Sequence, residues 1–130
     1  MTEGAKVAAR GAIVSIPAAL AVTFWAGRLF PSIVAWLLGF AFFLLALAPI
    51  AACSAFVIWK FSSRWPSRAS SLLPGTAFGV ATFYVECLFL YFVYPSAFGD
   101  PFSAANLFPG LVTGALTGYT RVGVGPARPV

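Results

Sequence analysis

The feature that most constrains the fold of this chain is a set of long runs without any charged residue. The longest run lies between Arg28 and Lys60 and contains 31 uncharged residues. Two others, of 17 and 20 residues, lie between Arg10 and Arg28 and between Asp100 and Arg121. A helix needs roughly 20 apolar residues to cross the hydrocarbon core of a bilayer. The runs therefore predict an integral membrane protein built of helices.

The composition supports this prediction and excludes two other classes. Hydrophobic residues make up 61% of the 130 residues and charged residues 8%, whereas ordinary soluble domains are about a quarter charged. Disordered chains are poor in apolar residues, so disorder of the whole chain is excluded as well. We predict one all-α domain, a four-helix transmembrane bundle with spans at about 11–30, 33–59, 72–94 and 105–122. A short disordered tail is expected at 123–130.

The basic residues predict how the bundle lies in the membrane. With four spans, seven of the eight basic residues fall on one side, and only Arg28 falls on the other. Segments rich in Lys and Arg face the cytoplasm, so we expect both termini there, in a bacterial-type plasma (inner) membrane. We interpret the net charge of +5 as this topology signal and expect no nucleic-acid partner, because no basic folded domain is present.

The first span has an alternative interpretation as a cleavable signal peptide. Lys6 and Arg10 precede an apolar stretch that contains several small residues, as in such peptides. The apolar run continues through Trp25 to Phe30, which is longer than a usual signal core. A retained span is therefore favoured.

Residues that could carry chemistry are scarce. The chain has no histidine, two cysteines at positions 53 and 87, and three acids at positions 3, 86 and 100. The absence of histidine excludes Ser-His-Asp catalysis, histidine zinc sites and histidine-ligated haem. The cysteine spacing is not that of a CxxC redox motif. We expect no catalytic residues, no metal, no cofactor and no enzymatic activity.

Small residues mark the faces on which the helices are expected to pack, because helices in lipid associate through close contact at such residues. The expected packing residues form GxxxG patterns with nearby threonines: Gly75 and Gly79 in the third span, and Gly110, Thr113, Gly114, Thr117 and Gly118 in the fourth. The first span carries a similar ladder of Ser15, Ala19, Thr23 and Gly27. These faces pack either within one chain or across an oligomer interface, and a pore lining is the alternative for the fourth span.

Glu86 is the one acid expected inside a span. An uncompensated charge at that depth costs roughly 2.5–3.5 kcal/mol on insertion scales. Helical spacing groups Glu86 with Gly75, Gly79 and Thr82, so we expect it to face the packed helices and not lipid. Arg28 is its nearest candidate partner. Glu86 either binds a proton or cation in a transport path, or forms a structural tie to Thr82, to Tyr84 or to a neighbouring helix.

Two functions of different classes remain. The first is a non-enzymatic membrane protein that acts through helix–helix contact with another membrane protein or with itself, as an accessory subunit, assembly factor or immunity protein. The alternative is a small proton- or cation-coupled transporter or channel that uses Glu86, as an oligomer. The face of Thr113 and Thr117 discriminates between them, since a water-lined path needs it accessible and a packing interface keeps it dry.

Overall fold

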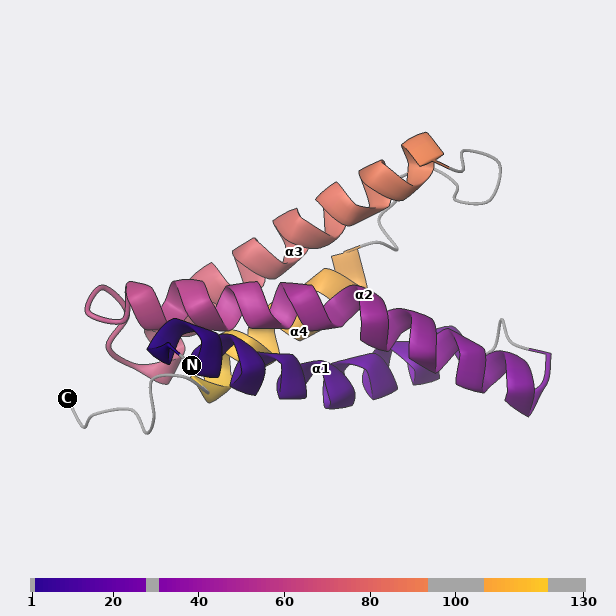
Figure 1. Cartoon of the computed structure of the whole chain (residues 1–130), viewed down its shortest axis with the longest axis horizontal. Coiled ribbons are helices and arrows are strands. Elements are labelled where there is room, and N and C mark those ends of the chain that lie inside the picture. The colour runs from indigo at the N-terminus through magenta and orange to yellow at the C-terminus, as the bar shows by residue number, and fades with distance from the viewer. Residues whose placement is uncertain (1, 28–30, 94–106, 122–130) are drawn as a thin grey trace.

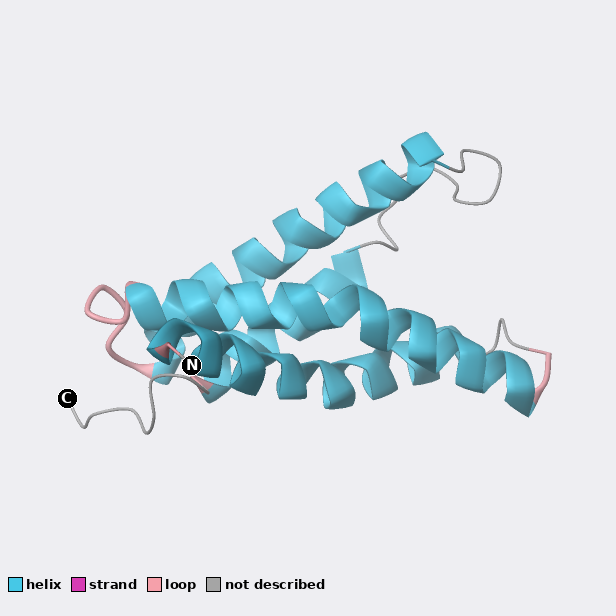
Figure 2. Ribbon diagram, in the orientation of Figure 1, coloured by secondary structure: helices cyan, strands magenta, loops and turns pink. Residues whose placement is uncertain are grey.

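The structure, a computed structural model, describes residues 2–27, 31–93 and 107–121. Within these residues the chain forms four α-helices and no strand (Figure 2). They are α1 (Glu3–Ala26), α2 (Ile33–Lys60), α3 (Arg68–Val93) and α4 (Leu107–Thr120). The prediction of an all-α, four-helix protein is therefore confirmed.

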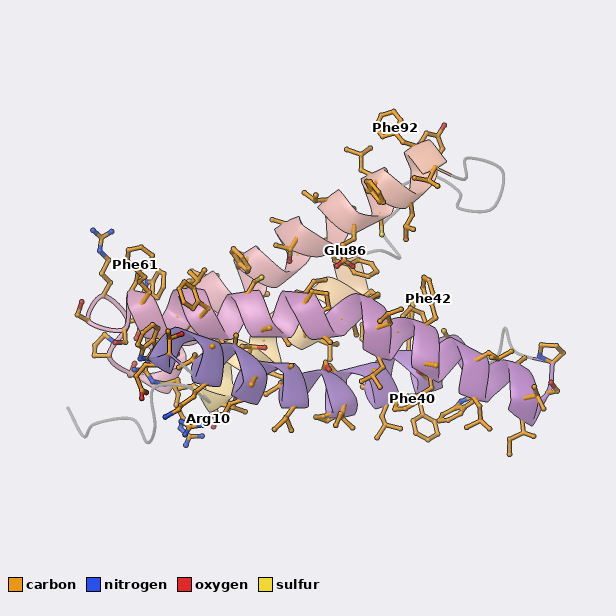
Figure 3. All side chains as sticks on the ribbon, in the orientation of Figure 1. Arg10, Phe40, Phe42, Phe61, Glu86 and Phe92 are labelled. Carbon is orange, nitrogen blue, oxygen red and sulfur yellow. The ribbon has the colours of Figure 1, made fainter. Side chains whose placement is uncertain are left out.

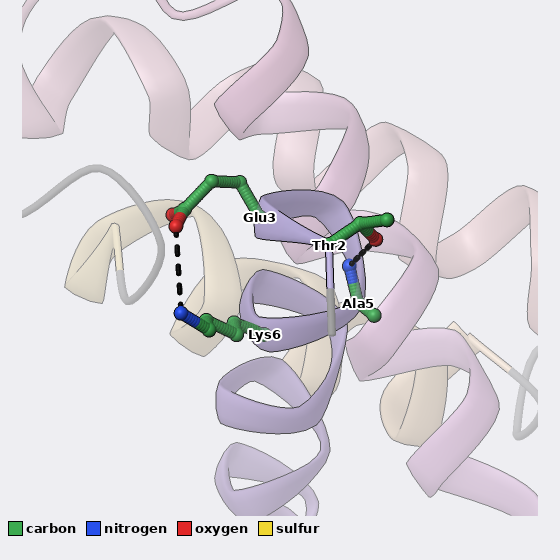
Figure 4. Close-up of polar contacts among 4 residues, drawn as sticks. All are labelled: Thr2, Glu3, Ala5 and Lys6. Atoms are coloured by element: carbon green, nitrogen blue, oxygen red, sulfur yellow. Dashed lines mark hydrogen bonds and ion pairs between the residues drawn. The ribbon is translucent and has the colours of Figure 1, made fainter.

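α1 begins at Glu3, before the membrane span expected at about 11–30. Polar groups explain the difference, because they stabilise the exposed first turn. The backbone N–H of Ala5 donates to the Thr2 hydroxyl (3.2 Å), and Glu3 lies 3.6 Å from the Lys6 ammonium (Figure 4). A side-chain N-cap and an acid in the first turn both favour helix initiation. Residues 28–30 of the expected first span lie outside the described residues.

α3 also begins before the membrane span that is expected within it, at Arg68, whereas the span is expected from about residue 72. Ser67 and Ser70 stabilise this end through reciprocal hydrogen bonds. The N–H of Ser70 donates to the Ser67 hydroxyl (3.1 Å), and the N–H of Ser67 donates to the Ser70 hydroxyl (3.0 Å). This arrangement resembles a capping box, in which two otherwise unpaired donors are satisfied together. α2, by contrast, begins at Ile33, the residue at which the second span is expected to start.

Three of the four helices, α1, α2 and α3, are long and apolar enough to cross a membrane. α4 has 14 residues and is therefore about 21 Å long, which is less than the hydrocarbon core of about 30 Å. Residues 105–106 and 122 of the expected fourth span lie outside the described residues, as does the expected tail at 123–130.

The helices are arranged as two pairs, α1 with α2 and α3 with α4 (Figure 1). α4 also contacts α1 and α2, so it joins the two pairs. The N-terminal end of α1, the α2–α3 connection and the C-terminal end of α4 all lie at one end of the molecule (Figure 1). From that end α3 leans progressively away from α2 (Figure 1). The buried core lies where the four helices meet and comprises Ala18, Ala19, Val22, Leu47, Ile50 and Phe83.

α1 and α2 approach each other closely at Gly11. A Cβ added at Gly11 would lie 2.5 Å from the Cβ of Ala55 and 2.7 Å from the carbonyl oxygen of Ala51. Gly11 precedes Ser15, Ala19 and Thr23 at four-residue spacing, and all four residues are buried. The small-residue ladder of α1 therefore packs inside the chain and begins one turn before the position that the sequence analysis gave it.

Candidate functional site

The contact between α3 and α4, here called the α3–α4 seam, is built on glycine. The glycines come from both helices: Gly75 and Gly79 in α3, and Gly110, Gly114 and Gly118 in α4. A Cβ added at Gly75 would lie 2.6 Å from the carbonyl oxygen of Gly114, and one at Gly110 would lie 2.6 Å from that of Gly79. Real Cβ atoms do not approach so closely, so the two backbones touch without intervening side chains. The two glycine patterns face each other in antiparallel order.

Two of the threonines of α4, Thr113 and Thr117, lie in this seam and are closed off from solvent and lipid. Thr113 and Thr117 are both 0% exposed. Their hydroxyls donate within α4, to the carbonyl oxygens of Pro109 (2.8 Å) and Thr113 (2.7 Å), respectively. The face that a water-lined path along α4 would need is thus dry and filled from within the chain.

Ser71 adds a hydrogen bond across the seam that the sequence analysis missed. Its hydroxyl oxygen lies 2.7 Å from the carbonyl oxygen of Gly118 and 3.0 Å from that of Ser67. Ser71 is completely buried. Its position four residues before Gly75, which is itself four residues before Gly79, was the signal available in the sequence.

Arg121 closes the seam at the end of the molecule where the α2–α3 connection lies. Its Nη1 donates to the carbonyl oxygens of Trp65 and Ser67, and its backbone has a positive φ of 49° at the end of α4. The residue is 3% exposed, and its Nε has no hydrogen-bond partner among the described residues.

A second feature of α3, here called the α2–α3 groove, lies beyond the seam, where α3 leans away from α2. It has a volume of about 460 Å³ and is lined by Phe42, Leu45 and Ala46 of α2 and by Val85, Glu86, Phe89 and Leu90 of α3. A smaller space of about 140 Å³ shares several of these residues and reaches Phe83 and Cys87. Glu86 points from α3 into the space between the helices (Figure 3).

Glu86, which is expected to face the packed helices and not lipid, points from α3 toward the space between the helices (Figure 3). It is half-buried and lines the groove just past the seam. Phe83 explains this position: a Cβ added at Gly110 would lie 2.9 Å from the Cβ of Phe83, so this bulky side chain marks the end of the close contact with α4. Farther along, α3 leans away from α2 (Figure 1), although Cys87 still packs against the buried core.

The expected partners of Glu86 do not satisfy its carboxylate in the part of the chain that the structure describes. Thr82 donates within its own helix instead, with its hydroxyl 2.8 Å from the carbonyl oxygen of Phe78 and 3.1 Å from that of Gly79. Arg28 lies outside the described residues. Across residues 2–27, 31–93 and 107–121, Glu86 forms no hydrogen bond and no ion pair. The groove therefore contains one uncompensated acid in an apolar wall.

The comparisons with known proteins assign no function to either feature. No protein-family model, no curated protein and no solved structure matches this chain. In the described ranges no three His, Cys, Asp or Glu side chains lie together as a metal-binding group. The two features of α3, the closed seam and the open groove, are therefore the basis on which function is considered.

Proposed function

We propose that this chain is a non-enzymatic, multi-pass membrane protein that acts through helix–helix contact with another membrane protein, as an accessory subunit, assembly factor or immunity protein. The main support for this proposal is the α2–α3 groove. It is an open apolar space between two helices that are suited to crossing a membrane. The partner contact is placed at this groove.

The closed seam supports the proposal, because it removes the chief alternative contact surface. Close approach at small residues is the main source of helix association in lipid. In this chain the glycines of α3 and α4 are already in contact with each other, and Thr113 and Thr117 are buried between them. A partner therefore meets the bulky residues and the single acid of the groove, not the small-residue faces.

The distribution of charge supports a plasma (inner) membrane location of bacterial type with both termini in the cytoplasm. Six of the eight basic residues are described: Lys6, Arg10, Lys60, Arg64, Arg68 and Arg121. They belong to the N-terminal half of α1 and to the segments around the α2–α3 connection and the end of α4, which lie at one end of the molecule (Figure 3). A basic end of this kind remains on the cytoplasmic side.

A second candidate function, a small proton- or cation-coupled transporter or channel, is favoured by Glu86 alone. Acids within membrane-spanning helices commonly mark ion or proton paths. Here such a path would follow the α2–α3 groove, since the threonine face of α4 is closed. Because the groove is open along one side, a second copy or another subunit would have to complete the wall.

The test is affinity purification of the tagged chain in mild detergent, followed by measurement of the mass and components of the complex. We expect a stoichiometric foreign membrane protein, which is lost in Ala46→Trp, a variant that fills the groove. Ala21→Trp is the matched control, because Ala21 is exposed on α1 and does not line the groove. A homodimer with no foreign component would contradict the proposal and favour transport, to be measured as proton or cation flux in proteoliposomes with Glu86→Gln.

A further inference from the structure

We infer that the α2–α3 groove binds a partner transmembrane helix that carries a lysine or arginine side chain at the depth of Glu86. This inference rests on the proposed function and adds the chemistry by which the partner is recognised. The site is the groove wall around Glu86, and the recognition is an ion pair formed inside the membrane between two different chains.

The chemistry of the residues that line the groove determines which groups a bound molecule must have. Except for Glu86, the side chains that line it are aromatic or aliphatic: Phe42, Leu45, Ala46, Val85, Phe89 and Leu90. A carboxylate in such surroundings requires a cation or a hydrogen-bond donor, because apolar side chains and lipid tails offer neither. The occupant must therefore combine an apolar surface with one basic group.

The described part of this chain does not supply that group. Its basic side chains lie at the other end of the molecule, and Arg68, the one on α3 itself, precedes Glu86 by 18 residues. This separation corresponds to about 27 Å along the helix. A second copy in the same orientation would place its described basic residues at the same wrong depth. We take a foreign helix as the occupant, and self-association of the chain is one outcome of the test below.

The shape of the groove favours a helix as the occupant. Its walls are two helices that diverge from each other, and it extends over residues 42–46 of α2 and 85–90 of α3 (Figure 1). Ala46 is the smallest lining residue, and small residues permit close approach of another helix. A basic side chain of such a helix reaches Glu86, while its apolar neighbours contact Leu45 and Phe89, which are both exposed.

The probe for the test is a synthetic Leu/Ala helix of 20 residues with one lysine about 10 Å from one end, which matches the distance of Glu86 from the end of α3. The matched peptide has glutamine in place of lysine. Full-length chain with Cys87→Ala, labelled at the exposed Cys53, is reconstituted in lipid vesicles, and association is measured by energy transfer. We expect the lysine peptide to bind at least about tenfold more tightly than the glutamine peptide.

Variants of the chain show whether Glu86 is responsible for the preference for the lysine peptide. Glu86→Gln is expected to abolish the preference for lysine, and Glu86→Lys to transfer it to a peptide with glutamate at the same position. Ala46→Trp is expected to reduce binding, while Ala21→Trp is not. Glu3→Gln is the control for loss of an acid, because Glu3 is exposed at the opposite end of the chain. Helical circular dichroism and thermal unfolding establish that each variant is folded.

Three results would overturn the inference. The first is equal binding of the lysine and glutamine peptides, or a preference that survives in Glu86→Gln. The second is Glu86-dependent self-association of the chain without peptide binding, which would make a second copy the occupant. The third is Glu86-dependent binding of dodecylammonium but not of the peptide, which would make a single-chain amphiphilic cation the occupant in place of a helix. If the foreign subunit still co-purifies with Glu86→Gln, the ion pair is excluded while the proposed function stands.

Discussion

The two ends of α3 contact their neighbours in opposite ways. At its N-terminal end, glycines and Ser71 bring the helix into backbone contact with α4 and leave no space. At its C-terminal end, bulky side chains and Glu86 line an open groove toward α2. Small residues thus hold the bundle together, and large residues line the surface that we propose for a partner. One helix can serve both purposes because the two contacts use different residues, so stability and partner binding are separable by mutation.

The largest expected effect comes from adding bulk to the seam. Gly114→Leu should destabilise the fold by about 3 kcal/mol or more, because even a Cβ at this position would overlap the backbone of Gly75. The measurement is unfolding of the purified chain in mixed micelles, followed by circular dichroism. Gly27→Ala is the control, since its added Cβ would meet Trp36 Nε1 at 3.5 Å, an ordinary contact. Equal stability of the two variants would show that the seam is not closely packed.

The next effect is expected at Arg121, which closes the seam. Arg121→Ala should cost about 2 kcal/mol of unfolding free energy, since it removes charge-assisted hydrogen bonds to two carbonyl oxygens. Arg64→Ala should change the unfolding free energy by less than about 0.5 kcal/mol, because Arg64 is exposed. Both variants are measured by the same unfolding experiment, and similar values for the two would argue against a closing role for Arg121.

Two serine-to-alanine substitutions should change the free energy of unfolding in opposite directions. Ser54 is fully buried and its hydroxyl has no partner among the described residues, so Ser54→Ala should raise the unfolding free energy by about 1 kcal/mol. Ser71→Ala should lower it by about 0.6 kcal/mol, a typical value for a hydrogen bond between membrane helices, because the bond to Gly118 is lost. Thermal unfolding of both variants measures this difference. If the two substitutions changed the stability in the same direction, the prediction would be refuted.

The smallest effect on stability is expected in the groove. Ala46→Trp should change the unfolding free energy by less than about 0.5 kcal/mol, because the added ring enters open space, although partner binding is lost. The same unfolding measurement applies. A loss comparable to that of Gly114→Leu would mean that the groove is closed in the folded chain, and the contrast between the two ends of α3 would disappear.

The helical class and most helix positions follow from the sequence, because long uncharged runs admit few other structures. Glycine spacing likewise marks the residues that meet in the seam. The position of Glu86 outside the seam does not follow, since helical spacing assigns a face but not the length over which two helices remain in contact. That length depends on the size of Phe83 and on the lean of α3. The burial of Arg121 and the contact of Gly11 depend on which helices pair, which the residue pattern does not contain.

The short α4 has a consequence for how the protein is made. Seven of its 14 residues are Gly, Thr or Pro, so the segment gains little from lipid on its own. Its favourable contacts are with α3, which is synthesised first. We therefore expect the membrane-insertion machinery to retain α3 until α4 emerges from the ribosome and to release the two as a hairpin. A chain that ends after α3 would expose the glycine face to lipid and become a substrate for membrane quality-control proteases.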